Sequence, residues 1–235
     1  MRAARALAAI ATLCVAVAAP AQEMDPDNPT CPAAPNWSSN ARMELTPADR
    51  NGARVLLAEG AIDTGLAARL RAALDADETI SEIWLRSPGG IATAGNEAGR
   101  LLRQSYPGIV TRVPAGWACF SACNFVFMGG QLRVVEPGGQ FIVHMFTHTG
   151  NREAIRSEVA AGTESTVAMI GAIEQSSAQL ASEDNDFLIR MGVSRRLLTE
   201  VMYAQQAVAS QENLSTRRCL TQDEVYMYNV ANVRE

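Results

Sequence analysis

The 235-residue sequence contains no lysine, and its 20 basic residues are all arginines. It contains two histidines, His144 and His148. The missing lysine excludes mechanisms that use a lysine amine as base or nucleophile, including the serine–lysine pair. General bases that work near neutral pH are therefore scarce, and such a role falls to one of the two imidazoles.

Long apolar runs are also scarce. One run over residues 6–19 follows two arginines and ends in the Ala-Pro-Ala of residues 19–21. The run is short for a membrane span, and this layout is typical of a secretory signal peptide with a small-x-small cleavage site. We expect cleavage after Ala21 and a periplasmic or secreted protein with no membrane span after processing. Retention of the segment as an N-terminal anchor is the alternative.

Basic residues are fewer than acidic residues once residues 1–21 are removed. Two of the 20 arginines lie in that segment, so 18 remain against 25 acidic residues, which gives a net charge of −7. Such a chain lacks the general basic surface that attracts a phosphate backbone, so nucleic acid is not expected as a partner. The remaining 214 residues suit one compact domain with a sizeable core.

Cysteine is also sparse, with five in the sequence, and Cys14 is lost with the signal peptide. An even number then remains: Cys31, Cys119, Cys123 and Cys219. Four cysteines in an oxidising compartment favour two disulfides, with three connectivities open, over four buried thiols or a catalytic thiol. Cys119 and Cys123 are four residues apart, within bridging reach of each other in one helical turn. That pairing would join Cys31 to Cys219; a bridge from either residue to Cys219 is equally open.

Strand and helix signals alternate up to about residue 150. Residues 22–42 are rich in Pro, Asn, Asp and Ser and predict an irregular lead-in to a domain over residues 43–235. Apolar runs predict strands over residues 54–62, 80–86 and 108–113, and two short strands around Pro137-Gly138-Gly139. Helical spacing of apolar residues predicts helices around residues 66–74, over 91–106 and from about 121 to 128.

Helical patterns dominate from Asn151 onward, with a break near Gly192 and a last helix over residues 220–230. The acidic SEDNDF run over residues 182–187 is predicted to be a solvated helix face. Alternating strands and helices followed by helices favour an α/β core with a helical C-terminal arm.

The stretch GWACFSACNFVFMGG (116–130) raises the possibility of serine chemistry, which requires a hydroxyl, a base and backbone N–H donors for an oxyanion. Ser121 lies at the predicted start of a helix, where free N–H groups favour negative charge. The N–H of Ala122 is the first candidate donor. Gly90, in a Ser-Pro-Gly-Gly turn after a strand, is the second, because glycine lets the backbone approach a ligand closely. His144 ends the apolar strand FIVH and is the candidate base, whereas His148 lies beyond it in a predicted loop.

The order and spacing of these pieces resemble the Clp protease proteolytic subunit and, more broadly, the Clp/crotonase superfamily. The family's strand, turn and helix resemble WLRSPGGIATAGNEAGRLLR (84–103). Its nucleophile segment and histidine strand resemble GWACFSACNFVFMGGQLRVVEPGGQFIVHMF (116–146), and its last helix and exit loosely resemble LTQDEVYMYNVAN (220–232). The Cys-x-Ser-Ala-Cys core is similar to that of a group of exported bacterial Clp-like proteins.

The resemblance implies a Clp/crotonase-like α/β fold of repeated ββα units with a helical C-terminal arm. It also implies a peptide or protein substrate, assembly into a homo-oligomer and no cofactor. Carried over residue by residue, Ser121 matches the nucleophile and His144 the general base, while Gly90 and Ala122 match the oxyanion-hole positions.

The family's third catalytic residue does not carry over. Its aspartate falls on or near Arg217, and an arginine cannot accept a hydrogen bond from a histidine or stabilise its cation. Either a serine–histidine dyad works alone, or another acceptor substitutes, of which Asn213 and Asp186 are conceivable. Loss of the third group predicts a slow enzyme or an inactive one.

We therefore expect an exported serine hydrolase, most simply a peptidase, that forms an acyl-enzyme at Ser121. The alternative is a non-catalytic Clp-like scaffold that binds a peptide or protein partner through the same groove, which the arginine favours. Crotonase-type chemistry on a thioester is a third hypothesis, which export disfavours. A zinc site at His144 and His148 would need helical geometry and a third ligand, and the local sequence offers neither; no metal is expected.

Overall fold

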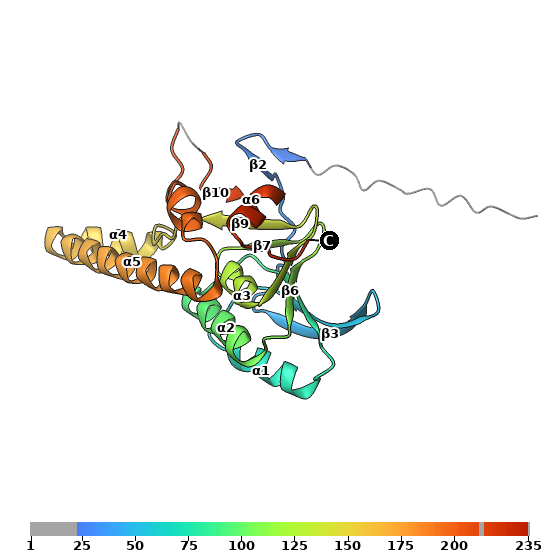
Figure 1. Cartoon of the computed structure of the whole chain (residues 1–235). Coiled ribbons are helices and arrows are strands. Elements are labelled where there is room, and N and C mark those ends of the chain that lie inside the picture. The colour runs from blue at the N-terminus through green and yellow to red at the C-terminus, as the bar shows by residue number, and fades with distance from the viewer. Residues whose placement is uncertain (1–22, 212–213, 235) are drawn as a thin grey trace, which may run out of the picture.

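The computed structural model describes residues 23–211 and 214–234, so the predicted signal segment lies outside the described residues. Five strands form the larger sheet in the order β3-β4-β5-β6-β8 (Figure 1). Their bounds are β3 Glu44–Arg50, β4 Ala53–Glu59, β5 Glu82–Arg86, β6 Val110–Val113 and β8 Leu132–Val135. The pair β3–β4 is antiparallel, and the other neighbours in this sheet are parallel.

Helices α1 (Leu66–Ala76), α2 (Ala92–Ser105) and α3 (Cys123–Gly129) lie along one side of this sheet (Figure 1). Parallel neighbours need such crossover connections, because a tight turn cannot join them. Glycines let α2 approach the α3 segment closely. A Cβ atom at Gly95 would lie 2.4 Å from the carbonyl oxygen of Ala122, and one at Gly99 would lie 2.3 Å from that of Phe125. The backbone that follows Ser121 therefore rests directly on α2.

A second, three-stranded sheet has the order β10-β9-β7, with bounds β7 Ala118–Phe120, β9 Gln140–His144 and β10 Arg217–Cys219. Strand β9 is parallel to β7 and antiparallel to β10. Alternate residues of β9 face two cores, as the pleat of a strand requires. Phe141 and Val143 join the main core, and Ile142 joins a smaller cluster that contains Cys31. An isolated bridge between Ser87 and Cys119 links the segment that follows β5 to β7.

The lead-in over residues 22–42 was expected to be irregular, and the structure corrects this expectation. It contains an antiparallel pair of strands, β1 (Met24–Asp25) and β2 (Asn28–Pro32). A disulfide joins Cys31 to Cys219, and the Asn28 side chain donates to the Arg217 carbonyl at 2.8 Å. These long-range ties to β10 order a segment whose composition alone is typical of a loop.

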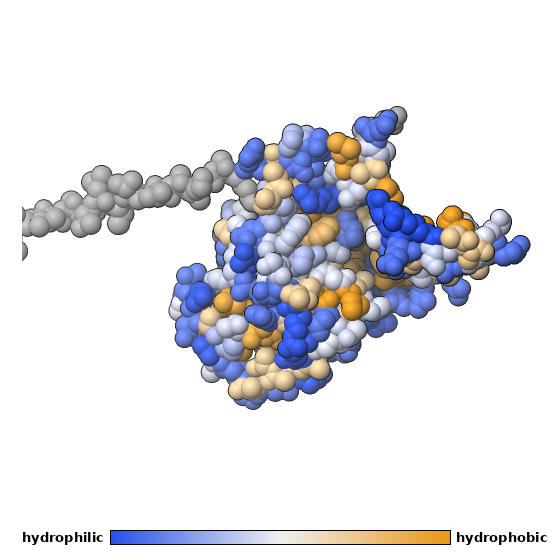
Figure 2. All heavy atoms as spheres, turned by 180° about the vertical axis from the view of Figure 1, so that it is seen from behind, coloured by the Kyte–Doolittle hydropathy of each residue, from blue (hydrophilic) through white to orange (hydrophobic). Residues whose placement is uncertain are grey.

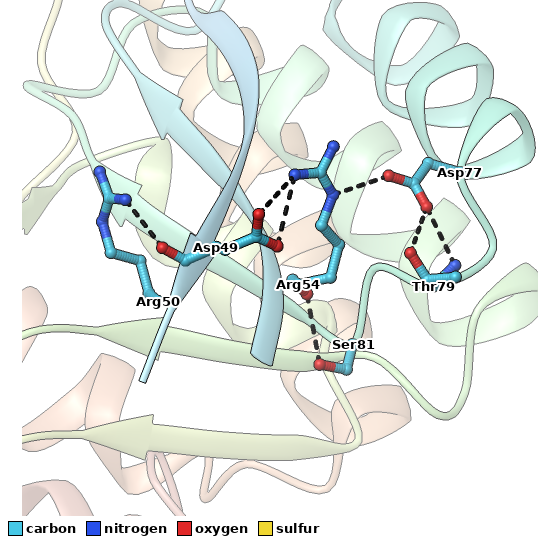
Figure 3. A network of polar contacts seen from close by, with 6 residues as sticks. All are labelled: Asp49, Arg50, Arg54, Asp77, Thr79 and Ser81. Atoms are coloured by element: carbon cyan, nitrogen blue, oxygen red, sulfur yellow. Dashed lines mark hydrogen bonds and ion pairs between the residues drawn. The ribbon is translucent and has the colours of Figure 1, made fainter. Parts of the chain in front are cut away.

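A polar network ties the end of α1 to the β3–β4 hairpin (Figure 3). The Arg54 guanidinium binds Asp77 at 2.9 Å and Asp49 at 3.4 Å. Asp77 in turn accepts hydrogen bonds from the hydroxyl and the backbone N–H of Thr79. The side chain of Ser81 donates to the Arg54 carbonyl. These contacts lie on a partly solvated surface, so they fix geometry more than they add stability.

Helices α4 (Arg152–Ala161) and α5 (Thr163–Met191) project away from the sheets (Figure 1). No residue of α4 is buried, and the buried residues of α5 all lie between Leu180 and Met191. Figure 2 shows this projection from behind, with apolar residues exposed beside hydrophilic ones. Helix α5 ends at Met191, and the next residue, Gly192, adopts a left-handed conformation with φ 67°, near the break that the sequence predicts.

The chain after α5 forms a π-helical turn, η1 (Leu197–Met202), and helix α6 (Gln222–Met227). Over residues 23–211 and 214–234, no helix combines the length and the apolar character needed to cross a membrane.

Two arginines fix the C-terminal ends of α3 and α5. The guanidinium groups of Arg103 and Arg133 both donate to the carbonyls of Gly130 and Met191. Cations there compensate the unpaired carbonyls at the ends of helices. Arg133 is 1% exposed and also binds two carbonyls beyond α6. Burial, and secondarily Arg103, lowers the pKa of Arg133 to about 10, so it remains charged at neutral pH.

Candidate active site

Ser121 and His144 are in direct contact. The His144 Nε2 atom lies 2.7 Å from the Ser121 Oγ atom. Ser121 follows the last residue of β7, and His144 is the last residue of β9. Because these two strands are parallel, their carboxyl ends reach the same edge of the sheet and bring the two side chains together. His148 instead lies 3.0 Å from the Ser176 hydroxyl on an exposed surface.

Ser121 occupies a sharp turn between β7 and α3, whereas the sequence predicts that it begins the helix. Its φ is 57°, a left-handed conformation that costs a non-glycine residue about 1–3 kcal/mol. The turn is held by the hydrogen bond from Asn124 N–H to the Ser121 carbonyl, at 2.9 Å. A disulfide between Cys119 and Cys123 brackets it. Strain of this kind persists where the surroundings determine the conformation, and it is common at functional sites.

The glycine turn after β5 lies against the serine. A Cβ atom at Gly89 would lie 2.5 Å from Ser121 Cβ and 3.1 Å from Ala122 N, so no side chain fits there. Gly89 and Gly90 have φ values of 86° and 147°, which favour glycine. Among the described residues, the N–H groups of Gly90 and Ala122 donate no hydrogen bond to the protein. Both groups are therefore free to serve a ligand.

Burial lowers the pKa of His144 from its ordinary value, and a hydrogen bond with the Met145 backbone acts in the opposite direction. The imidazole is therefore neutral at neutral pH, which is the form that accepts a proton. Its ring packs against Phe120, with centroids 4.7 Å apart, and Phe120 stacks on Trp37 at 5.5 Å. The lead-in segment thus helps to hold the imidazole in place.

Arg217 lies where the resemblance places the family's aspartate, directly opposite His144 in the β9–β10 pair. Its guanidinium lies 3.5 Å from an Asp25 carboxylate oxygen and 5.8 Å from the centre of the Trp37 ring. Within the part of the chain that the structure describes, no carboxylate forms an ion pair with His144.

The two other acceptors considered from the sequence do not fill this place. Asp186 binds Arg190 at 2.7 Å and Arg100 at 3.5 Å instead of the imidazole. Asn213 lies outside the described residues. The described part of the site is thus a serine–histidine pair whose imidazole is oriented by backbone and ring contacts.

A cavity of about 320 Å³ opens beside Ser121 and His144. Its walls are largely apolar and come from α3, α5 and η1, including Phe125, Leu180 and Met202. This volume is at the lower end of the range of about 300–1,000 Å³ for ligand pockets. The cavity therefore suits one long side chain or a short peptide segment.

The sequence did not single out one acidic residue of the cavity. Asp184 lies in the acidic run predicted to be a solvated helix face, but it is 5% exposed and lines the cavity. Its neighbours in the run, Glu183 and Asp186, lie on other faces of α5 because consecutive helical residues point in different directions. The sequence did carry a signal: Leu180, Phe187 and Leu188 stand four residues before and three and four residues after Asp184, which is the spacing of one apolar helix face.

The two histidines considered as zinc ligands have separate partners, since His144 contacts Ser121 and His148 contacts Ser176. Over residues 23–211 and 214–234, no group of three or more His, Cys, Asp or Glu side chains is placed to hold a metal ion.

No protein-family model matches the chain, and no curated protein matches it. Among solved structures, a mutant of ClpP1 from Listeria monocytogenes is similar, with a TM-score of 0.50 and 16% identity over 75% of this chain and 87% of that chain. The chain has a ClpP-like fold. A mutant of the membrane-bound stomatin-specific protease 1510-N is also similar, with a TM-score of 0.47 and 17% identity over 74% of each chain. At these identities the likeness to ClpP concerns the fold, and the chemistry depends on the site itself.

Proposed function

We propose that this protein is a serine hydrolase, most simply a peptidase, that forms an acyl-enzyme at Ser121. The observation that carries the proposal is the 2.7 Å contact between Ser121 Oγ and His144 Nε2, beside a cavity suited to a side chain. The strained turn at Ser121 and the two free N–H groups nearby add support. The ClpP-like fold agrees with a peptidase scaffold.

The reaction proceeds in two steps. His144 Nε2 accepts the proton of the Ser121 hydroxyl as Oγ attacks the substrate carbonyl carbon. The N–H groups of Gly90 and Ala122 donate to the oxyanion that forms. The imidazolium then passes its proton to the leaving amine, the C–N bond breaks, and the acyl group remains on Ser121. In the second step His144 deprotonates a water molecule, which hydrolyses the ester and restores the serine.

The dyad is expected to be slow. A carboxylate behind the histidine stabilises the imidazolium, and the backbone of Met145 supplies at most a neutral acceptor. Arg217 adds a positive charge on the neighbouring strand, although its ion pair with Asp25 offsets part of that charge. The proposal is therefore an enzyme with low turnover but a competent nucleophile.

We further propose that the protein is exported and belongs to the exported group with the Cys-x-Ser-Ala-Cys motif. Its fold is proposed to consist of repeated ββα units with a helical C-terminal arm. Two disulfides, Cys31–Cys219 and Cys119–Cys123, favour an oxidising compartment. A homo-oligomer is proposed from the resemblance to the Clp subunit.

Labelling with an uncharged fluorophosphonate tests the proposal, because this probe reacts with an activated serine without needing a specific side chain. We expect wild type to be labelled and Ser121→Ala to be unlabelled, while His144→Ala loses at least tenfold in rate. Ser176→Ala is the matched control, since Ser176 also contacts a histidine but lies on the exposed surface. Equal labelling of wild type and Ser121→Ala would contradict the proposal.

A non-catalytic scaffold that binds a peptide or protein partner is the second candidate. The observation that favours it is Arg217 at the position of the family's aspartate. Under this alternative a folded wild-type sample, verified by circular dichroism, binds peptides in the cavity but is not labelled by the fluorophosphonate at millimolar concentration.

A further inference from the structure

The cavity beside Ser121 contains a buried carboxyl group that the proposed reaction does not use. Asp184, on α5, is 5% exposed and lines the same cavity as Ser121 and His144. One of its carboxyl oxygens accepts a hydrogen bond from Asn96 Nδ2 at 3.3 Å. Its other oxygen accepts none from the described residues.

Asn96 reinforces this arrangement. It lies on α2, is 6% exposed, and its Oδ1 atom is buried without a hydrogen-bond partner among the described residues. Asp184 and Asn96 together therefore hold hydrogen-bond acceptors that the protein leaves unsatisfied. Buried polar groups are nearly always paired, and Asp184 lines the cavity, so its unpaired oxygen indicates a ligand that supplies donors there.

No protein cation compensates Asp184. Over the described residues, none of the arginines forms an ion pair with it. The ionisable groups that act on it or respond to it are Glu183, on the same helix, and Tyr203, whose pKa is raised by burial and by the Asp184 charge. Burial raises the pKa of Asp184 to about 6, so it is ionised at pH 7 and above. The charge is negative, buried and unpaired, which is costly until a cation arrives.

We propose, on the basis of the serine hydrolase described above, that Asp184 selects substrates that place a basic side chain, arginine or lysine, in this cavity. The apolar walls formed by Phe125, Leu180 and Met202 contact the alkyl stem, as apolar surfaces commonly do for long basic side chains. The carboxylate of Asp184 then accepts charge-assisted hydrogen bonds from the guanidinium or ammonium group. Asp184 is thus a specificity-determining residue, distinct from the serine and histidine that perform the chemistry.

Three matched peptide esters test this selection. They differ at one residue, the one that supplies the acyl group, which is arginine, its uncharged isostere citrulline, or norleucine. At pH 7.5 we expect kcat/KM for arginine to exceed that for citrulline and norleucine at least tenfold. Asp184→Asn should lower the arginine-to-norleucine ratio at least tenfold. Asp186→Asn, two residues along the same helix but partly exposed and paired with Arg190, is the matched control and should leave the ratio unchanged.

Equal rates for arginine and norleucine, or an unchanged ratio in Asp184→Asn, would overturn the selection. Fluorophosphonate labelling separates this failure from failure of the hydrolase itself, because labelling with a norleucine preference leaves the hydrolase intact. If no ester is turned over, calorimetry with acetyl-arginine amide and acetyl-citrulline amide decides the matter on the Ser121→Ala variant. Tighter binding of the arginine ligand by at least tenfold, lost when Asp184→Asn is added, supports the selection; equal binding of the two ligands overturns it.

Discussion

The catalytic competence of Ser121 depends on the protonation of one imidazole. Because burial lowers the pKa of His144, the neutral form persists below the ordinary value near 6.5. A base is active when deprotonated, so activity is present above the folded-state pKa and is lost as pH falls through it.

We therefore expect kcat/KM for the uncharged norleucine ester to decline only below pH 6.5. With the arginine ester, ionisation of Asp184 near pH 6 adds a second protonation, so the decline is steeper. Asp184→Asn should make the two profiles parallel. The measurement is kcat/KM from pH 4.5 to 8.5 with both esters, and an acidic midpoint above 6.5 for the norleucine ester contradicts this assignment.

The raised pKa of Asp184 also predicts how the stability of the protein depends on pH. Burial raises its pKa from 3.8 to about 6, so between these values the folded state holds a proton that the unfolded state has released. Its contribution to stability is present below pH 3.8 and is lost as pH rises through 6. Asp184→Asn should therefore gain in stability over wild type as pH rises, by up to about 3 kcal/mol at pH 8. Urea unfolding of both proteins at pH 4.5 and 8 measures this, and a gap that does not widen with pH contradicts it.

Arg133 is the residue on which the ends of three helices depend. Arg133→Met would remove the guanidinium donors of the Asn229 and Val230 carbonyls and leave those of Gly130 and Met191 with Arg103 alone. We expect the free energy of unfolding to fall by about 3 kcal/mol or more. Arg196→Met is the matched control, because Arg196 forms an exposed pair with Glu200 and should lose only about 0.5 kcal/mol. Similar losses in the two variants would show that the buried contacts contribute little.

At the scale of elements, the two disulfides have different roles. Cys31–Cys219 spans 188 residues and fastens the lead-in to β10, whereas Cys119–Cys123 spans 4 residues around Ser121. A bridge that closes a long loop constrains the unfolded chain more strongly. The long bridge is therefore expected to serve stability, and the short one the shape of the turn.

The expected outcome is a crossed pattern. Replacing Cys31 and Cys219 with alanine should lower the free energy of unfolding by about 2–5 kcal/mol, and replacing Cys119 and Cys123 should lower it by less. The second variant should instead slow fluorophosphonate labelling more than the first, measured on samples that remain folded. The reverse order in both measurements would contradict these roles.

The elements that position the site were predictable from the sequence, and their surroundings were less so. Strands β4, β5, β6 and β9 carry apolar runs, because they are buried in the core. Strand β3 was missed, since it is an exposed edge strand with Pro47 in its middle. The strands of the lead-in were missed because a disulfide and contacts with β10 order them, and such long-range ties leave no local pattern.

The contact between Ser121 and His144 agrees with the sequence prediction, because each residue lies at the end of a recognisable segment. The burial of Asp184 was missed, although Leu180, Phe187 and Leu188 stand at helical spacing around it and place it on the apolar face of α5. The acidic residues beside it in the run led to the prediction of a solvated face. The choice among the disulfide connectivities, in contrast, needed the fold.

At the scale of the whole molecule, α5 performs two tasks. Its first part lies in the projection, with exposed apolar residues such as Val167 and Ile170. Its last part closes the cavity with Leu180 and Asp184. One continuous helix therefore connects the surface that projects from the body with the wall of the site, so the two parts are mechanically joined.

Acylation of Ser121 can be read directly from the mass of the acyl-enzyme. Wild type is mixed with the arginine ester, quenched in acid within one turnover and digested, and the peptide that contains Ser121 is weighed. We expect a mass increase equal to the acyl group on that peptide in wild type and no increase in Ser121→Ala. Ester hydrolysis by wild type without this adduct, or an adduct on another residue, would contradict acylation at Ser121.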